Sequence, residues 1–295
     1  MKVRRRRFAT LVFVWGAFCF APCLAELRSF QMPPKTIHII HMYHKGDGPD
    51  PFPWASIGGP IPPGASALNT GGDQNGDGWP SFNINPVTGE GECTWSRNNG
   101  GQMDIAFSET SVGVWNDIVL LTSSAESERD PRLAFSSSTG GTKIVYWLDN
   151  GSPQVFMIER NSATVPWSAP ILVSDSSGPA RYPSDAVAQG RVHVGYEVER
   201  AASGKDIIVS GRPENGTGPF SPEVVAHVSY GGKAEVILDQ GGSKVWATWV
   251  NSDSDVGYSV FDGTHWGVPQ FWPYSSSDDI DTVRFQIRLS IIEGN

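Results

Sequence analysis

The chain is poor in cysteine and in charge, and each scarcity excludes a class of protein. It has three cysteines in 295 residues, and two of them, Cys19 and Cys23, lie within the first 25 residues. The rest of the chain can therefore hold neither a disulfide framework nor a cysteine metal site, and we interpret Cys93 as a core thiol. Only 18% of the residues are charged, and acids exceed bases, so we expect no binding of nucleic acid.

The first 25 residues have the composition of a signal peptide. Basic residues at Lys2 and Arg4–Arg7 are followed by an apolar run from Phe8 to Phe20 and by the small residue Ala25. We predict cleavage near Ala25 and export to the periplasm or the medium, with no membrane insertion afterwards. Cleavage removes five bases and no acid from 22 Lys+Arg and 31 Asp+Glu, which leaves a formal charge of −14.

Two alternatives for this segment stay open. The stretch Phe8–Ala25 has 18 residues, almost enough to span a bilayer, so a retained N-terminal anchor is the alternative to cleavage. The arginine run also resembles a twin-arginine signal, so the export route is undecided between that pathway and general secretion.

Turn formers and aromatic residues dominate the remaining sequence. The chain has 33 Gly and 22 Pro, which disfavour helices, and 11 Trp, 14 Phe and 7 Tyr, which supply apolar surface for a packed core. An alternation such as Val192, Val194, Tyr196 and Val198 with polar or small residues between them is typical of a β-strand. We therefore expect an all-β protein.

Three sets of markers recur with a period of about 51 residues. The first set opens a strand at Pro80, Pro131, Pro183 and Ala234. The second consists of the aromatics Trp95, Trp147, Tyr196 and Trp249. The third consists of Trp115, Trp167, Phe220 and Trp266. A unit of this length with four short strands has the size of a propeller blade, and an all-β solenoid or sandwich is the alternative.

The repeat predicts a β-propeller of five four-stranded blades in residues 73–295. Residues 26–72 would hold a Pro/Gly-rich loop and a strand, Thr36–Tyr43, that completes the last blade and closes the ring. The partner of that strand would be the final alternating segment, 283–291.

The third unit carries motifs of a known family. Tyr182–Ser184, Gly190–Tyr196, Asp206–Val209 and Pro219–Pro222 resemble the repeats of bacterial sialidase-like (BNR-type) propellers. The resemblance implies a propeller fold. The family's Asp-box is present only in a degenerate form at Asp262–Trp266, and the Arg-Ile-Pro motif of true sialidases is missing, which weakens an enzymatic interpretation.

The ligand face of a propeller is built by the loops between blades and by those between the second and third strands of each blade. Polar residues in those segments are Arg97, Asp130, Arg132, Asp149, Arg181, Tyr182, Asp185, Arg200, Asp253 and Arg284. The candidate ligand-binding residues among them are Arg132, Arg181, Tyr182, Asp185 and Arg284. Sialidases bind a carboxylate with three arginines. A sialidase site in this chain would therefore require Arg132, Arg181 and Arg284 to converge. For each residue the alternative is a solvated surface group.

A calcium loop is the sharpest local motif. Oxygen-bearing side chains alternate with other residues and a glycine marks the turn, as in loops that wrap a hard cation. The candidate ligands are Asp73, Asn75, Asp77, the carbonyl of Trp79, and Ser81. The motif resembles the calcium loops of FG-GAP propellers, whereas Ile84 at the twelfth position excludes an EF-hand. A plain Asx/Gly turn is the alternative, so Ca²⁺ is an expectation only.

We therefore expect an exported, non-catalytic binding propeller whose partner is a glycan or an extracellular protein. The alternative is a glycoside hydrolase of the sialidase or arabinanase type, and a purely structural domain is a third option. Catalysis would require two carboxylates facing each other across a sugar, and no motif marks such a pair.

Overall fold

The computed structural model describes residues 23–27, 40–44, 54–55, 66–67, 77–112, 114–175, 177–200, 204–228, 237–241, 244–250 and 256–272. The regular elements in these ranges are β-strands, and the sheets are antiparallel. No helix in these ranges is long and apolar enough to cross a membrane.

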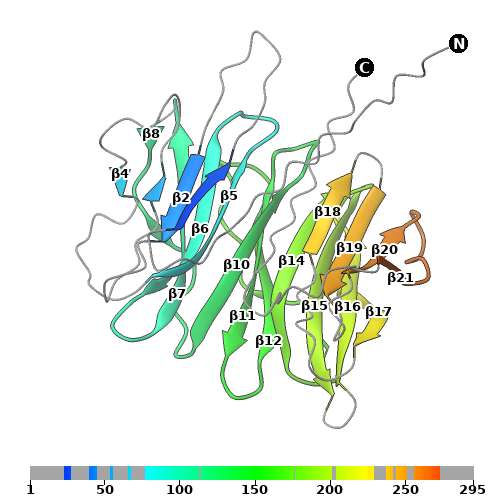
Figure 1. The fold of residues 1–295 in the computed structure, drawn as a ribbon. Coiled ribbons are helices and arrows are strands. Elements are labelled where there is room, and N and C mark those ends of the chain that lie inside the picture. Colours follow the sequence, from blue (N-terminus) through cyan, green and yellow to red (C-terminus); the bar gives the residue numbers. More distant parts are fainter. Residues whose placement is uncertain are drawn as a thin grey trace, which may run out of the picture.

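Four sheets follow one another along the chain, and the strands of each sheet lie in chain order (Figure 1). The first blade contains β5 (Gly78–Ile84), β6 (Gly91–Asn98), β7 (Met103–Ser111), β8 (Val114–Trp115) and β9 (Val119–Leu120), of which β8 and β9 both pair with β7. The second contains β10 (Ser127–Phe135), β11 (Thr142–Asp149), β12 (Gln154–Arg160) and β13 (Ile171–Leu172). The third contains β14 (Ala180–Ala188), β15 (Arg191–Arg200), β16 (Gly204–Pro213) and β17 (Ser221–Val228). The fourth contains β18 (Ile237–Gly241), β19 (Lys244–Val250), β20 (Val256–Phe261) and β21 (Gln270–Trp272).

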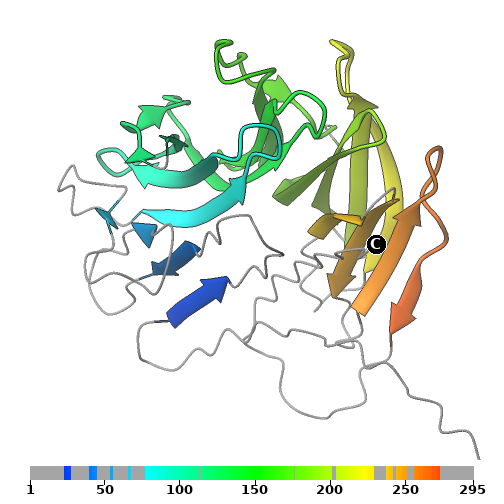
Figure 2. The ribbon, with the colours of Figure 1, turned by 90° about the horizontal axis from the view of Figure 1, so that it is seen from above.

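The four sheets fan around a common centre in chain order, as the view from above shows (Figure 2). The first strands β5, β10, β14 and β18 contact one another in succession and so lie innermost. This is the arrangement of propeller blades, and it confirms the all-β architecture expected from the repeat.

Apolar side chains fill the space between consecutive blades. One cluster joins the first and second blades and includes Phe107 and Tyr146, and another joins the second and third and includes Met157 and Tyr196. A third cluster joins the third and fourth blades around Trp249. Each inner blade is thus covered on both faces, which explains why every residue of β15 from Val192 to Val198 is buried.

The structure corrects one of the repeat markers. Relative to the proline of the first strand, Trp95 and Tyr196 occupy the same place, and the residue at that place in the second blade is Tyr146. Trp147 lies one residue later, so its side chain points to the opposite face of its blade, toward the third blade. Tyr146 and Trp147 are adjacent aromatics, and the spacing alone assigned the wrong one of them to the repeat.

The five-blade count and the closing strand stay predictions. Strand β2 (Ile40–His44) overlaps the expected closing strand, and it pairs with β1 (Cys23–Leu27) in a two-stranded sheet. Strands β3 (Trp54–Ala55) and β4 (Ser66–Ala67) form another short pair. The expected final strand at 283–291 lies outside the described residues.

Candidate functional site

The first strands of three blades share one irregularity at the same place. The pairing register shifts between Gly78 and Ser81 in β5, between Arg129 and Arg132 in β10, and between Arg181 and Ser184 in β14. Each shift is a β-bulge, and each contains a proline together with the residue before it. The residues before the prolines are Trp79, Asp130 and Tyr182, with φ of 50°, 55° and 53°.

These three backbone conformations are costly. Residues with side chains rarely have positive φ, and a residue before proline is normally extended. Each such position costs about 1–3 kcal/mol and persists only where its surroundings hold it, which is commonly a functional site. A bulge also redirects a side chain out of the regular pleat. Here all three redirected side chains, Trp79, Asp130 and Tyr182, line one cavity.

The cavity has a volume of about 280 Å³ and lies where the first three blades meet. Its lining combines three aromatic rings with three charged groups: Trp79, Trp147, Tyr182, Arg129, Asp130 and Asp149. Pockets for drug-sized ligands begin at about 300 Å³, so this one suits a single small ring.

Each charged group of the cavity has a partner of opposite sign. Arg129 pairs with Asp149 at 2.9 Å between Nε and Oδ2, and its guanidinium lies 5.4 Å from the centre of the Trp79 ring. Asp130 is buried and pairs with Arg132 at 3.0 Å between Oδ1 and Nη2. The acidic groups therefore face the cavity as compensated carboxylates.

Trp147 enters the cavity because it departs from the blade repeat. Its indole meets the ring of Tyr182 edge-on, with 6.1 Å between the ring centres, and the guanidinium of Arg181 lies 5.7 Å from its own ring centre. Its Nε1 is buried and finds no hydrogen-bond partner among the described residues. A large ring on this face of the blade extends the wall that Tyr182 begins.

The structure brings together only some of the candidate residues. Tyr182 lines the cavity. Arg132 is the ion-pair partner of Asp130, which also lines it. Arg181 pairs with Glu199 at 2.7 Å, so it and Arg132 are held by different carboxylates. Asp185 is buried on β14, opposite Val194 and outside the cavity lining. Arg284 lies outside the described residues, so convergence of the three arginines stays untested.

The calcium loop likewise stays a prediction. Asp73 and Asn75 lie outside the described residues, while the carboxylate of Asp77 accepts hydrogen bonds from Trp95 Nε1 at 3.1 Å and from the backbone N–H of Asn98 at 3.0 Å. Across the described ranges, no group of three or more His, Cys, Asp or Glu side chains is placed to hold a metal ion.

Sequence reasoning placed Asp130 and Asp149 on the ligand face but missed Arg129 and the role of Trp147. A usable signal was present for the core of the site. The residues directly before the three repeat prolines, at positions 79, 130 and 182, follow the blade period and are all aromatic or acidic.

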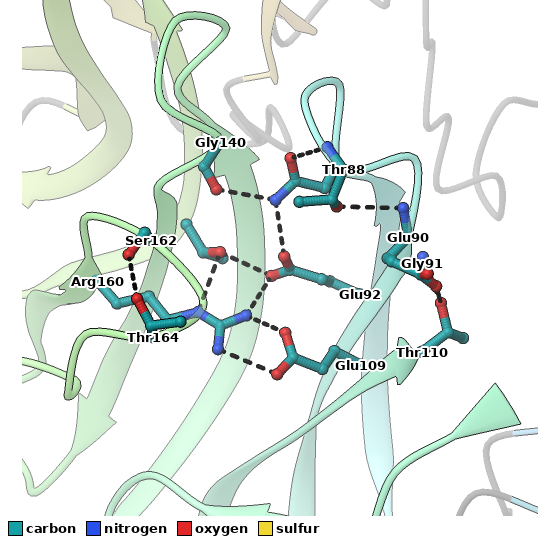
Figure 3. A network of polar contacts seen from close by, with 12 residues as sticks. Thr88, Glu90, Gly91, Glu92, Glu109, Thr110, Gly140, Arg160, Ser162 and Thr164 are labelled. Carbon is teal, nitrogen blue, oxygen red and sulfur yellow. Dashed lines mark hydrogen bonds and ion pairs between the residues drawn. The ribbon is translucent and has the colours of Figure 1, made fainter. Parts of the chain in front are cut away.

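A second polar cluster joins the first two blades at their other end (Figure 3). Arg160, at the end of β12, forms an ion pair with buried Glu92 at 3.3 Å and a two-pronged contact with Glu109. Asn85 and Thr142 also donate hydrogen bonds to Glu92, at 2.9 Å and 2.7 Å. Burial nevertheless raises the pKa of Glu92, because these contacts offset the loss of hydration only in part.

Two further buried acids have a raised pKa, and both lie outside the cavity lining. Burial raises the pKa of Glu128 despite hydrogen bonds from Ser124 and Thr122. Burial also raises the pKa of Glu197, although Lys205 binds both of its oxygens at 2.9 Å. The groups best suited to hold a proton are therefore separate from the cavity.

Comparison with solved structures shows the fold. A leech intramolecular trans-sialidase has a TM-score of 0.53 at 9% identity, over 68% of this chain and 51% of that one. The intramolecular trans-sialidase from Ruminococcus gnavus has a TM-score of 0.51 at 8% identity, over 68% and 71%. A Hadza microbial sialidase has a TM-score of 0.51 at 12% identity, over 78% and 53%.

The chain thus spans about half the length of two of these structures, and the likeness shows a sialidase-like propeller fold. No family model matches the sequence, and no curated protein is significantly similar to it.

Proposed function

We propose that this chain is an exported, non-catalytic propeller that binds a carbohydrate in the cavity between its first three blades. The observation that carries the proposal is the lining, in which three aromatic rings surround a compensated set of charged groups. Aromatic faces accept the C–H surfaces of a sugar ring, and carboxylate and guanidinium groups bind its hydroxyls through charge-assisted hydrogen bonds.

The size of the cavity favours a glycan over a protein as the ligand. A stable protein interface covers about 800 Å² on each partner, whereas this hollow admits one small ring. The sialidases of similar fold act on sugars, which supports a carbohydrate ligand for a related propeller.

Titration of the purified protein with glycans found on an array tests the proposal. We expect Trp79→Ala to weaken binding at least tenfold, equivalent to about 1.4 kcal/mol, because it removes one aromatic wall. Phe271→Ala is the matched control, since Phe271 is an aromatic on β21 that is 47% exposed and lies outside the cavity. An array on which no glycan binds would refute the proposal.

A glycoside hydrolase is the alternative function, and the sialidase-like fold supports it. The cavity contains two carboxylates, as hydrolysis requires, but Asp130 and Asp149 are each paired with an arginine. Turnover of fluorogenic glycosides by the purified protein, lost in both Asp130→Asn and Asp149→Asn, would establish the enzyme and exclude a purely binding role.

A further inference from the structure

We infer that the cavity selects an uncharged sugar unit and rejects an acidic one. This inference rests on the proposed function and adds the chemical class of the ligand. It starts from the charges that line the cavity: one guanidinium, that of Arg129, and two carboxylates, those of Asp130 and Asp149.

Each of three arginines described in or beside the cavity already has an internal carboxylate as its ion-pair partner. Arg129 is engaged by Asp149, Arg132 by Asp130, and Arg181 by Glu199. An acidic sugar would have to share or displace one of these carboxylates, because a guanidinium has several donors but only one positive charge, and the internal carboxylate would remain in or beside the same cavity. Exchange of one carboxylate for another brings little gain and adds a like charge nearby.

Burial strengthens this discrimination. The side chain of Asp130 is only 5% exposed, so a ligand carboxylate that drew Arg132 away would leave Asp130 as a buried charge without its partner. The whole chain also has a formal charge of −9, which disfavours the approach of anionic glycans.

A hydroxyl group fits the same surroundings without any displacement. It can donate a hydrogen bond to Asp149 or Asp130 and accept one from Arg129 while both ion pairs persist. The aromatic rings of Trp79, Trp147 and Tyr182 are indifferent to this exchange, so they supply affinity while the charged groups supply selectivity.

Matched pairs of ligands test the inference by calorimetric titration. The probes are methyl glucoside with methyl glucuronide, methyl galactoside with methyl galacturonide, and lactose with 3'-sialyllactose. We expect the neutral member of at least one pair to bind, with at least tenfold higher affinity than its acidic partner.

Asp149→Asn is the diagnostic variant, because it removes a carboxylate and releases Arg129. We expect it to narrow the ratio of the two affinities at least threefold, through a gain for the acidic member. Asp117→Asn removes the same charge from an exposed loop outside the cavity, and it should leave the ratio unchanged.

The outcomes separate this inference from the proposed function. Equal or tighter binding of the acidic members to the unaltered protein would overturn the inference and leave carbohydrate binding intact. An equal effect of the Asp117 and Asp149 variants would assign the selectivity to overall charge and likewise overturn it. Failure of all six probes and of every other glycan would overturn both.

Discussion

His193 occupies a position that faces the next blade at the end opposite the cavity. The equivalent residues in the first two blades are Glu92 and Lys143, which are parts of ion-pair networks, whereas His193 packs against the rings of Phe261 and Trp266, with ring centres 4.7 Å and 6.0 Å away. Burial and the charge of Arg191 lower the pKa of His193 to about 4.

We predict that acidification destabilises the protein through His193. Its pKa is lower in the folded than in the unfolded chain, so the unfolded chain binds more protons as the pH falls. The contribution of neutral His193 to the free energy of unfolding is fully present above about pH 6.5. It is lost as the pH falls, and the loss reaches about 3 kcal/mol at pH 4. Urea unfolding between pH 4 and 7.5 measures this loss.

His193→Gln should flatten that pH profile, because glutamine does not titrate. His265→Gln, at an exposed position, is the control and should leave most of the slope in place. A profile for the His193 variant as steep as that of the unaltered protein would assign the acid sensitivity to other groups.

Val112 carries backbone strain in the turn after β7, where its backbone N–H donates a hydrogen bond to Glu90 at 2.9 Å. It has φ of 53° and is 90% exposed, and a β-branched residue is poorly suited to that conformation. We predict that Val112→Gly raises the free energy of unfolding by about 1 kcal/mol, because the strain is relieved and almost no packing is lost.

The same substitution two residues later provides the comparison for Val112. Val114 is also exposed but lies in β8, so Val114→Gly should destabilise the protein. Denaturant midpoints of both variants test this pair, and a loss of stability in Val112→Gly would contradict the strain argument.

At the scale of single residues, the sequence predicted which residue types recur in each blade better than the exact position that each residue occupies. Pro80, Pro131 and Pro183 were recognised as equivalent, because a repeated proline is visible in any alignment of the chain on itself. The exchange of Trp147 for Tyr146 was not, because the two rings are adjacent and only the strand pairing shows which one keeps the register.

At the scale of the blades, arginines at the ends of third strands hold neighbours together. Arg160 on β12 contacts Glu92 and Glu109 of the first blade, and Arg212 on β16 contacts Glu159 of the second. Burial alone would raise the pKa of Glu159, but hydrogen bonds and charges from Lys143 and Arg212 outweigh it and lower the pKa. The corresponding residue of the fourth blade is Phe261, which matches the apolar contact with His193.

We predict that Arg160→Met lowers the free energy of unfolding by about 3–5 kcal/mol at pH 7, because it leaves buried Glu92 without its counter-charge. The double variant Arg160→Met with Glu92→Gln should recover part of the loss. Chemical unfolding of the single and double variants measures both effects.

Arg181→Met is the matched control for Arg160→Met. Its ion pair with Glu199 is partly exposed, with side chains 27% and 44% accessible, so its loss should cost about 0–1 kcal/mol. Equal effects of the Arg160 and Arg181 variants would show that the buried network adds nothing beyond a surface pair.

The sequence predicted the elements well because a blade is a local object. Hairpins join strands that are consecutive in the chain, so spacing and turn residues suffice to mark them. The arginine contacts were not predicted, because they cross between blades about 50 residues apart and depend on which face each strand presents.

At the scale of the whole molecule, the cavity exists only because three blades meet. Trp79, Asp130 and Tyr182 belong to different sheets, and none of them alone resembles a binding motif. The packing of sheets around a centre brings them together, which is why repeat analysis found the architecture but not the site.

The export prediction and the packing of the first blade can be tested together through Cys93. This thiol is fully buried, and burial raises its pKa, so both access and thiolate formation are suppressed in the folded protein. We predict that protein recovered from the producing cells' periplasm or medium begins near Glu26 and shows one thiol per chain by Ellman titration in denaturant, with almost none reactive before unfolding. Three reactive thiols in denaturant would mean that the segment with Cys19 and Cys23 is retained. Rapid reaction of the native protein, absent in Cys93→Ser, would show instead that the first blade opens under native conditions, because its core cannot otherwise admit the reagent.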